Sequence, residues 1–307
     1  MNDGKVDWEG SFIAVVTPFT DGGQIDESRF IENLELLISE GADGFVISGC
    51  TGESWSLSGD DRLQIFRLAA ETVAGRMPVI GGTGGINTRS VGELSRAAAE
   101  AGCDGVMILP PYYAVINRRE IIAHFHTVSE TAKTPILLYN IPKRTGINMQ
   151  PDLLAELAEI EWIVALKQSS NDFVELEQTL DAVGNRINVF AGHSAERGVA
   201  AVLMGCPGFV SSMESQIMGA EAISMYRLAM DGDLEEARRV QMRTLALDKG
   251  MRSTGTFPAN LKTAMNLLGR PGGFARPPLL DLDQAETAKV RTVLDGLSLL
   301  GDKQDAA

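Results

Sequence analysis

The chain has 307 residues, of which 44% are hydrophobic and 22% are charged, a composition typical of a globular protein with one large core or two smaller ones. Its formal net charge of −14 argues against binding to nucleic-acid backbones or anionic membranes, because both need basic patches. The N-terminus lacks the basic and apolar regions of a signal peptide, and no segment has the length of a membrane span. We therefore expect a cytoplasmic protein that acts on small molecules.

Short apolar runs alternate with longer helix-like stretches along the chain, which is typical of a parallel sheet built from βα units. The expected strands are 12–17, 44–48, 78–82, 105–109, 135–139, 162–167, 187–191 and 208–211. Each is followed by a helix-like stretch, such as 26–40, 88–101 or 214–230. The eight units predict an α/β fold, the (β/α)8 TIM barrel.

Three glycine-containing segments end helix-like stretches and lead into even-numbered strands. They begin at Gly41, Gly102 and Gly205. Glycine is favoured just after a helix because it has no Cβ and adopts the left-handed backbone conformation without strain. We expect these glycines to end helices before short loops that enter the strands.

Three amphipathic segments, 233–250, 257–268 and 284–299, follow the eighth unit and predict a helical appendix packed on the barrel. A glycine- and proline-rich connector, 269–278, lies between them and should have no regular structure. The expected organisation is a barrel over 8–232, a C-terminal helical extension over 233–300 and a disordered tail over 301–307.

Cysteine and histidine are too sparse to suggest a disulfide framework or a metal site. The three cysteines, Cys50, Cys103 and Cys206, are widely spaced and odd in number, which favours free thiols. His124 and His126 are two apart on an expected helix, so they face different directions and cannot chelate together. We expect no bound metal and no cofactor.

Lys167 is the only charge at the end of the apolar run 162–167. A desolvated lysine binds its proton less tightly, and the neutral amine is a nucleophile. At the C-terminal end of a barrel strand, such an amine is a candidate for forming a Schiff base with a carbonyl substrate. The alternative is a lysine whose stem is buried and whose ammonium group reaches solvent.

The C-terminal ends of barrel strands and the loops after them form one mouth, where candidate residues should converge. Besides Lys167, three segments end there: 49–54, 110–113 and 139–146. Together with Lys167, the nucleophile, these segments supply phenols for proton transfer, a hydroxyl and a guanidinium.

The motifs in these segments resemble those of a known family. They are Gly-Cys-Thr-Gly-Glu at 49–53, Tyr-Asn-Ile-Pro at 139–142, an apolar strand that ends in Lys167, and Arg-Pro-Pro-Leu at 276–279. In this order and spacing, the chain resembles the family of dihydrodipicolinate synthase and N-acetylneuraminate lyase, the pyruvate-dependent class I aldolases. The resemblance extends from about residue 8 to residue 280.

The resemblance implies a role for each matching residue. Lys167 would attack C2 of pyruvate or a related 2-oxo acid and form an iminium that stabilises an enamine. Tyr139 would shuttle protons, although it could also be a packing tyrosine inside the barrel. Thr51, with the backbone N–H groups of its turn, would hold the substrate carboxylate and relay protons.

Two further roles concern the second substrate and a neighbouring subunit. Arg144 would bind the carboxylate of the second substrate, unless it is a solvated loop arginine. Tyr113 would complete the proton relay by reaching across a subunit interface, and Tyr112 is the residue that could be confused with it. The resemblance therefore implies a homodimer or a homotetramer.

The chain departs from both main subfamilies. Dihydrodipicolinate synthases have two threonines where this chain has Cys50-Thr51, and a thiol is a weaker hydrogen-bonding group. Neuraminate lyases lack an arginine at the place of Arg144. His193 stands where both subfamilies have acidic residues, so it could contact a different substrate or be a histidine satisfied at the barrel rim. Cys50, His193 and Val210 complete the expected substrate-binding set.

The leading hypothesis is a cofactor-independent Schiff-base lyase that acts on pyruvate or another 2-oxo acid and an aldehyde second substrate. The expected activity is the dihydrodipicolinate synthase reaction of pyruvate with aspartate semialdehyde, a step in lysine biosynthesis. The alternative within the family is an aldolase or dehydratase of 2-keto-3-deoxy sugar acids or hydroxy-oxoglutarate. A non-catalytic protein that binds 2-oxo acids is a hypothesis from another class. The scarcity of histidine argues against a metal-dependent hydrolase.

Overall fold

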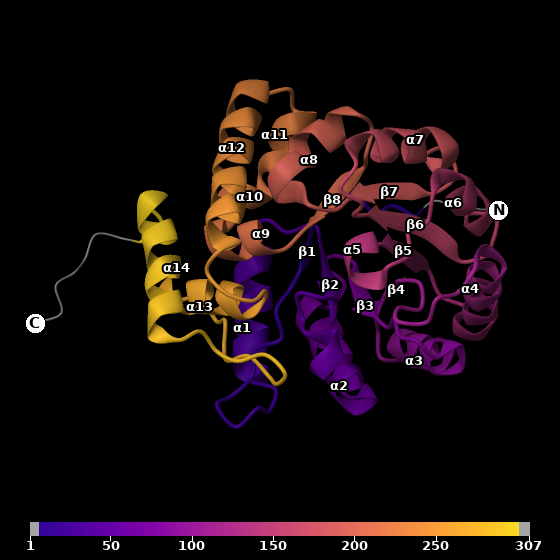
Figure 1. Ribbon diagram of the computed structural model, residues 1–307, viewed down its shortest axis with the longest axis horizontal. Helices are drawn as coiled ribbons and strands as arrows, with labels where there is room; N and C mark the ends of the chain where they lie inside the picture. Colours follow the sequence, from indigo (N-terminus) through magenta and orange to yellow (C-terminus); the bar gives the residue numbers. More distant parts are fainter. Residues whose placement is uncertain (1–5, 301–307) are drawn as a thin grey trace, which may run out of the picture.

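The computed structural model describes residues 6–300, and its centre is a closed barrel of eight strands that pair in chain order (Figure 1). All the strand pairs are parallel. The strands are β1 (Gly10–Ala14), β2 (Gly44–Ile47), β3 (Val79–Gly82), β4 (Gly105–Ile108), β5 (Ile136–Asn140), β6 (Ile163–Gln168), β7 (Asn188–Ala191) and β8 (Gly208–Ser211). The predicted fold class, a (β/α)8 barrel, is confirmed.

The first strand differs from its prediction of 12–17, because β1 begins at Gly10 and ends at Ala14. Residues 15–17 are buried like strand residues, which explains why the apolar run is misleading. The Val15 amide still donates to the Val46 carbonyl of β2 at 3.2 Å, but the Val16 amide donates to Oε1 of Gln216 at 3.0 Å rather than to a neighbouring strand. The side chain of Gln216 therefore replaces the strand partner that the Val16 amide would have in a β-sheet.

Helices surround the barrel in an outer ring. They are α1 (Glu27–Ser39), α2 (Gly59–Val73), α3 (Thr88–Glu100), α4 (Arg118–Ala132), α6 (Pro151–Leu157), α7 (Phe173–Val183) and α8 (Ser194–Leu203). Two short helices, η1 (Ser54–Ser56) and α5 (Pro142–Thr145), lie in the loops after β2 and β5. Side-chain caps mark several helix starts, such as the capping box of Ser58 at α2.

The predicted helix over 214–230 is instead three short helices. They are α9 (Met213–Met218), α10 (Ala220–Ile223) and α11 (Met225–Met230). Gly219 lies at φ 58° and ψ −133°, which is outside the helical region and interrupts the helical hydrogen bonds. The periodicity of the apolar residues survives this break, so the pattern alone predicts one continuous helix.

The three glycines expected at helix ends have the predicted conformation. Gly41, Gly102 and Gly205 have φ values of 96°, 99° and 103° and follow the ends of α1, α3 and α8. A side chain is strained at such positive φ values. These glycines let each helix turn directly into the next strand.

Side chains fill the inside of the barrel as well as the layer between barrel and helices. The inner cluster contains large residues from facing strands, including Phe12, Val46, Met107, Leu137 and Phe190. The barrel is therefore a packed core rather than a pore, and the space for a ligand lies beyond the strand ends.

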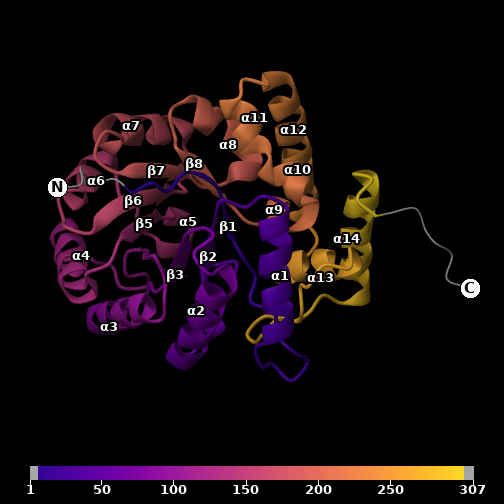
Figure 2. The same cartoon turned by 180° about the vertical axis from the view of Figure 1, so that it is seen from behind.

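The C-terminal helices are α12 (Leu234–Met251), α13 (Ala259–Leu267) and α14 (Gln284–Gly296). Figures 1 and 2 show α13 and α14 together on the side of the barrel next to α1. Helices α12 to α14 share an apolar cluster with α9 and Val16. This packing brings the C-terminal part of the chain against the barrel near β1. The predicted tail, 301–307, lies outside the described residues.

Within residues 6–300, no helix is long and apolar enough to cross a membrane. In the same range, no group of side chains of the metal-binding types could hold a metal ion. The three cysteines are free thiols, and burial raises the pKa of Cys103 and of Cys206 to about 12.

Candidate active site

A cavity of about 770 Å³ opens at the C-terminal ends of the barrel strands. Seven of the eight predicted site residues line it: Cys50, Thr51, Tyr139, Arg144, Lys167, His193 and Val210. Its outer wall includes residues of α12 and of the segment that follows it, among them Asp248, Met251, Arg252 and Phe257. The cavity therefore extends from the C-terminal ends of the barrel strands to the C-terminal helices.

Lys167 and Tyr139 lie side by side because they are register partners in the neighbouring strands β6 and β5. Lys167 is only 7% exposed, and its Nζ lies 4.4 Å from the centroid of the Tyr139 ring. Burial lowers the pKa of Lys167 to about 8, against the opposing charges of Cys50 and Glu214. The neutral, nucleophilic fraction of this lysine near neutral pH is therefore larger than that of a solvated lysine.

Tyr139 retains its proton at neutral pH. Burial raises the pKa of its phenol well above the usual value, and the nearby Cys50 adds to this effect. The side chains of Cys50 and Ser169 lie within hydrogen-bonding reach of the hydroxyl group. A neutral phenol with such neighbours can donate a proton to a reacting oxygen and recover it from them.

The turn that carries Cys50 and Thr51 has a strained backbone. Ser48 and Glu53, on either side of it, have φ values of 57° and 55°, in the left-handed region that non-glycine residues rarely adopt. Each such residue costs about 1–3 kcal/mol unless its surroundings hold it. The Thr17 hydroxyl donates to the Gly52 carbonyl at 2.9 Å and supplies part of that support. Thr51 is buried in the cavity wall.

Arg144 lies on the exposed rim in α5, which begins directly after β5. Its guanidinium is 5.5 Å from the centroid of the Trp55 ring, a cation–π arrangement that orients it. The neighbouring Lys143 also lines the cavity. The rim thus has two cations that could attract the carboxylate of an incoming ligand.

Tyr113 is absent from the cavity of its own chain and is 92% exposed, next to the fully exposed Val115. Tyr112 is half-buried. The two tyrosines are therefore distinguished by exposure, and Tyr113 is the one free to contact another molecule. Its predicted role in a neighbouring subunit stays a prediction.

His193 begins α8 with a left-handed backbone, and its Nε2 lies 3.3 Å from the Ser169 carbonyl oxygen. Burial lowers the pKa of this imidazole, and the charge of Arg197 lowers it further. His193 is therefore a neutral cavity residue. Val210, on β8, adds a buried apolar surface to the same cavity.

Glu214 was not predicted as a site residue, yet it is buried in the cavity wall. The Ser194 hydroxyl donates to its Oε1, and burial raises the pKa of the carboxyl. Ser169 and Asn171, which follow β6, were also missed. Their position directly after a strand end is the signal that could have found them, whereas the apolar periodicity places Glu214 on a continuous outer helix.

The match to known proteins covers nearly the whole chain. Residues 7–297 match the model of the dihydrodipicolinate synthetase family. The chain belongs to this family. An uncharacterized DapA-like lyase of Rhizobium meliloti is 38% identical over 96% of this chain and 98% of its own length. A 4-hydroxy-tetrahydrodipicolinate synthase of Geobacter sulfurreducens is 34% identical over 95% of this chain and all (100%) of its own.

Solved structures of family members have the same fold. A dihydrodipicolinate synthase superimposes with a TM-score of 0.89 at 32% identity, covering 95% of this chain and 100% of its own. YagE, a prophage protein of the family from E. coli K12 solved in complex with pyruvate, gives 0.90 at 28% identity, covering 96% of this chain and 100% of its own. The chain is therefore an enzyme, a class I lyase of the dihydrodipicolinate synthetase family.

Proposed function

We propose that Lys167 forms a Schiff base with pyruvate or a related 2-oxo acid. The observation that carries this proposal is a buried lysine, with its pKa lowered to about 8, that faces a cavity beside a protonated tyrosine. The neutral amine attacks C2, Tyr139 protonates the former carbonyl oxygen, and that oxygen leaves as water. Loss of a proton from C3 of the iminium gives the enamine.

The enamine carbon then attacks the carbonyl of an aldehyde, and hydrolysis returns the free lysine. Thr51 and the backbone N–H groups of its turn hold the carboxylate of the 2-oxo acid throughout, while Cys50 and Ser169 connect to the Tyr139 hydroxyl. No cofactor is needed, because the lysine itself supplies the electron-withdrawing group. In an oligomer, Tyr113 of a neighbouring chain would extend the relay.

The first candidate for the reaction is condensation of pyruvate with aspartate semialdehyde, the 4-hydroxy-tetrahydrodipicolinate synthase activity of lysine biosynthesis in the cytoplasm. Relatives with this activity are 33% to 35% identical to the chain. The cations Lys143 and Arg144 at the cavity rim suit the carboxylate of the semialdehyde.

The second candidate is an aldolase or dehydratase of a 2-keto-3-deoxy sugar acid or of hydroxy-oxoglutarate. Its support is a polar part of the cavity wall, where Ser194, Ser212 and Glu214 could bind hydroxyl groups. Cys50 favours it as well, since a thiol weakens the relay that the synthase reaction uses.

One substrate comparison separates the candidates. Purified enzyme is supplied either with pyruvate and aspartate semialdehyde or with a panel of 2-keto-3-deoxy sugar acids and hydroxy-oxoglutarate. Consumption of the semialdehyde supports the synthase, while release of pyruvate or loss of water from a panel member supports the alternative. Absence of turnover with every substrate would contradict both candidates.

A further inference from the structure

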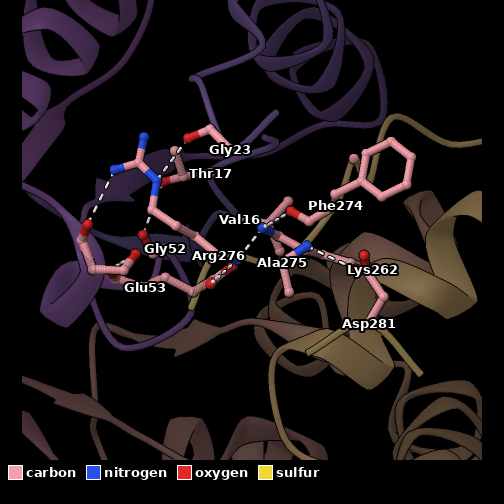
Figure 3. A network of polar contacts seen from close by, with 12 residues as sticks. Val16, Thr17, Gly23, Gly52, Glu53, Lys262, Phe274, Ala275, Arg276 and Asp281 are labelled. Carbon is pink, nitrogen blue, oxygen red and sulfur yellow. Dashed lines mark hydrogen bonds and ion pairs between the residues drawn. The ribbon is translucent and has the colours of Figure 1, made fainter. Parts of the chain in front are cut away.

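A buried ion pair joins the substrate-binding turn to the C-terminal helices (Figure 3). Glu53 comes two residues after Thr51, and Lys262 belongs to α13. The two side chains are 0% and 1% exposed, so neither charge reaches solvent. The pair therefore fixes one end of the turn to a segment more than two hundred residues away in the chain.

Backbone groups of the connector complete this network. The Lys262 ammonium donates to the Phe274 carbonyl at 2.7 Å, and the Arg276 amide donates to Glu53 Oε2 at 3.1 Å. The Phe19 ring lies under both cations, 4.4 Å from Lys262 Nζ and 4.2 Å from Arg276 Cζ. We call Glu53, Lys262, Phe274 and Arg276 the clamp.

The Arg276 side chain contacts the segment that follows the turn and the loop that follows β1. Its guanidinium donates to the Ser56 carbonyl at 3.0 Å, to Asp61 Oδ2 at 2.8 Å and to the Gly23 carbonyl at 2.9 Å. The clamp thus reaches both the end of η1 and the first turn of α2. A displacement of the connector would move the whole segment that follows Thr51.

A gain in stability does not explain why this ion pair is buried. The free energy needed to remove two charges from water is about as large as the free energy of their attraction. The position of Glu53 offers a better explanation. Its backbone is in the left-handed conformation, and its amide donates to the Cys50 carbonyl at 3.2 Å to close the turn. Such a conformation persists only where the surroundings over-determine it.

We propose that the clamp is a positioning device: the Glu53–Lys262 pair sets the geometry of the Cys50–Thr51 turn and thereby the affinity for the carboxylate of the 2-oxo acid. The proposal rests on the proposed function of that turn. It assigns Lys262 and the connector a part in substrate binding, although neither lines the cavity.

The test compares Glu53→Gln and Lys262→Met with the control variant Arg270→Gln. Arg270 forms a two-bond ion pair with Glu40 of 2.7 and 2.6 Å, 13% and 17% exposed, which ties the same connector to the end of α1. Pyruvate is titrated against each folded variant, with borohydride trapping of the lysine adduct as the readout. Each titration is run below the melting temperature of that variant.

In the clamp variants, the pyruvate concentration for half-maximal trapping should rise about tenfold or more, which corresponds to about 1.4 kcal/mol of binding. The adduct yield at saturating pyruvate should stay unchanged, because Lys167 is intact. The control should lose thermal stability but keep its half-maximal concentration within about twofold. The double variant Glu53→Gln/Lys262→Met should regain stability without regaining affinity.

Unchanged pyruvate affinity in folded clamp variants, or an equal loss in Arg270→Gln, would overturn the proposal. Hydrogen exchange of the peptide over 49–56 provides a readout that does not depend on pyruvate. Exchange there should speed up in the clamp variants and not in the control, and equal exchange in all of them would contradict the clamp. If wild-type enzyme traps no adduct, the proposed function fails, and hydrogen exchange still decides whether the clamp holds the turn.

Discussion

Lys167 and Lys262 are two buried lysines with the same lowered pKa and different surroundings. Burial lowers the pKa of each to about 8, and each Nζ lies 4.4 Å from the centroid of an aromatic ring. Lys262 forms an ion pair with Glu53, whereas no carboxylate of residues 6–300 pairs with Lys167, which faces the cavity. A lowered pKa alone therefore does not identify a catalytic lysine. The cavity that Lys167 faces is what distinguishes it from Lys262.

Replacing Lys167 should have the largest effect on activity. Lys167→Met removes the nucleophile, and we expect turnover to fall by at least about a thousandfold, since residues that form covalent intermediates are rarely replaceable. Steady-state kinetics with whichever candidate substrate the wild-type enzyme turns over measures this loss. Residual activity above a few per cent in Lys167→Met would contradict the claim that Lys167, unlike Lys262, is the nucleophile.

Tyr139→Phe should have the next largest effect. Loss of the hydroxyl removes the proton donor to the leaving oxygen, and we expect a loss of about a hundredfold to ten-thousandfold in kcat with little change in stability. Ser169→Ala is the matched control, because it removes a neighbour of the Tyr139 hydroxyl but keeps the phenol. A Tyr139→Phe enzyme that traps the adduct at the wild-type rate would contradict the assigned proton transfer.

The order of the two effects should reverse when the free energy of unfolding is measured in place of activity. Lys262→Met leaves Glu53 buried without its partner, and we expect the free energy of unfolding to fall by about 3–5 kcal/mol. Lys167→Met removes a buried charge that has no carboxylate partner, so we expect no loss beyond about 1 kcal/mol. Urea unfolding of both variants gives the comparison. Equal losses would show that the two sites are not distinguished by their ion pairing.

The sequence predicted the barrel and most of the cavity because both follow from local patterns. Apolar runs locate the strands, and a polar residue at the end of a run, such as Lys167 or Tyr139, lies at the mouth by the geometry of the fold. The failures arise where distant segments meet. Gln216 replaces the ladder partner of Val16, and Lys262 pairs with Glu53, although nothing in either local pattern points to the other.

The cavity wall at Glu214 was missed for a related reason. Its segment has the apolar spacing of a long outer helix, and that spacing hides the break at Gly219. This break separates α9, whose Met213 and Glu214 line the cavity, from the helices that follow. In the proposed function, this wall and the rim cations select the substrate. Fold-level patterns therefore predict the class of reaction better than its substrate.

Changes at the two sides of the cavity should alter substrate choice moderately. If aspartate semialdehyde is the substrate, Arg144→Ala should raise its KM about tenfold to a hundredfold through loss of a charge-assisted pair, and Glu214→Ala should matter little. If a hydroxylated acid is the substrate, the order reverses. KM measured for both substrates in both variants decides between them, and equal effects would contradict either assignment.

The pH dependence should be the mildest and most diagnostic effect. Because burial disfavours the ammonium form, the neutral fraction of Lys167 grows as pH rises toward its pKa of about 8 and is nearly complete above it. The rate of borohydride trapping at subsaturating pyruvate should rise about tenfold per pH unit below 7 and level off above 8 to 9. A rate that continues to rise beyond pH 10 would indicate an ordinary, solvated lysine.

Mapping the trapped adduct tests the central claim most directly. Wild-type enzyme is reduced with borohydride in saturating pyruvate, digested and sequenced by mass spectrometry. We predict one modified residue, Lys167, with Lys262 unmodified in spite of its equally lowered pKa. An adduct on Lys262, or no adduct on any lysine, would contradict the account.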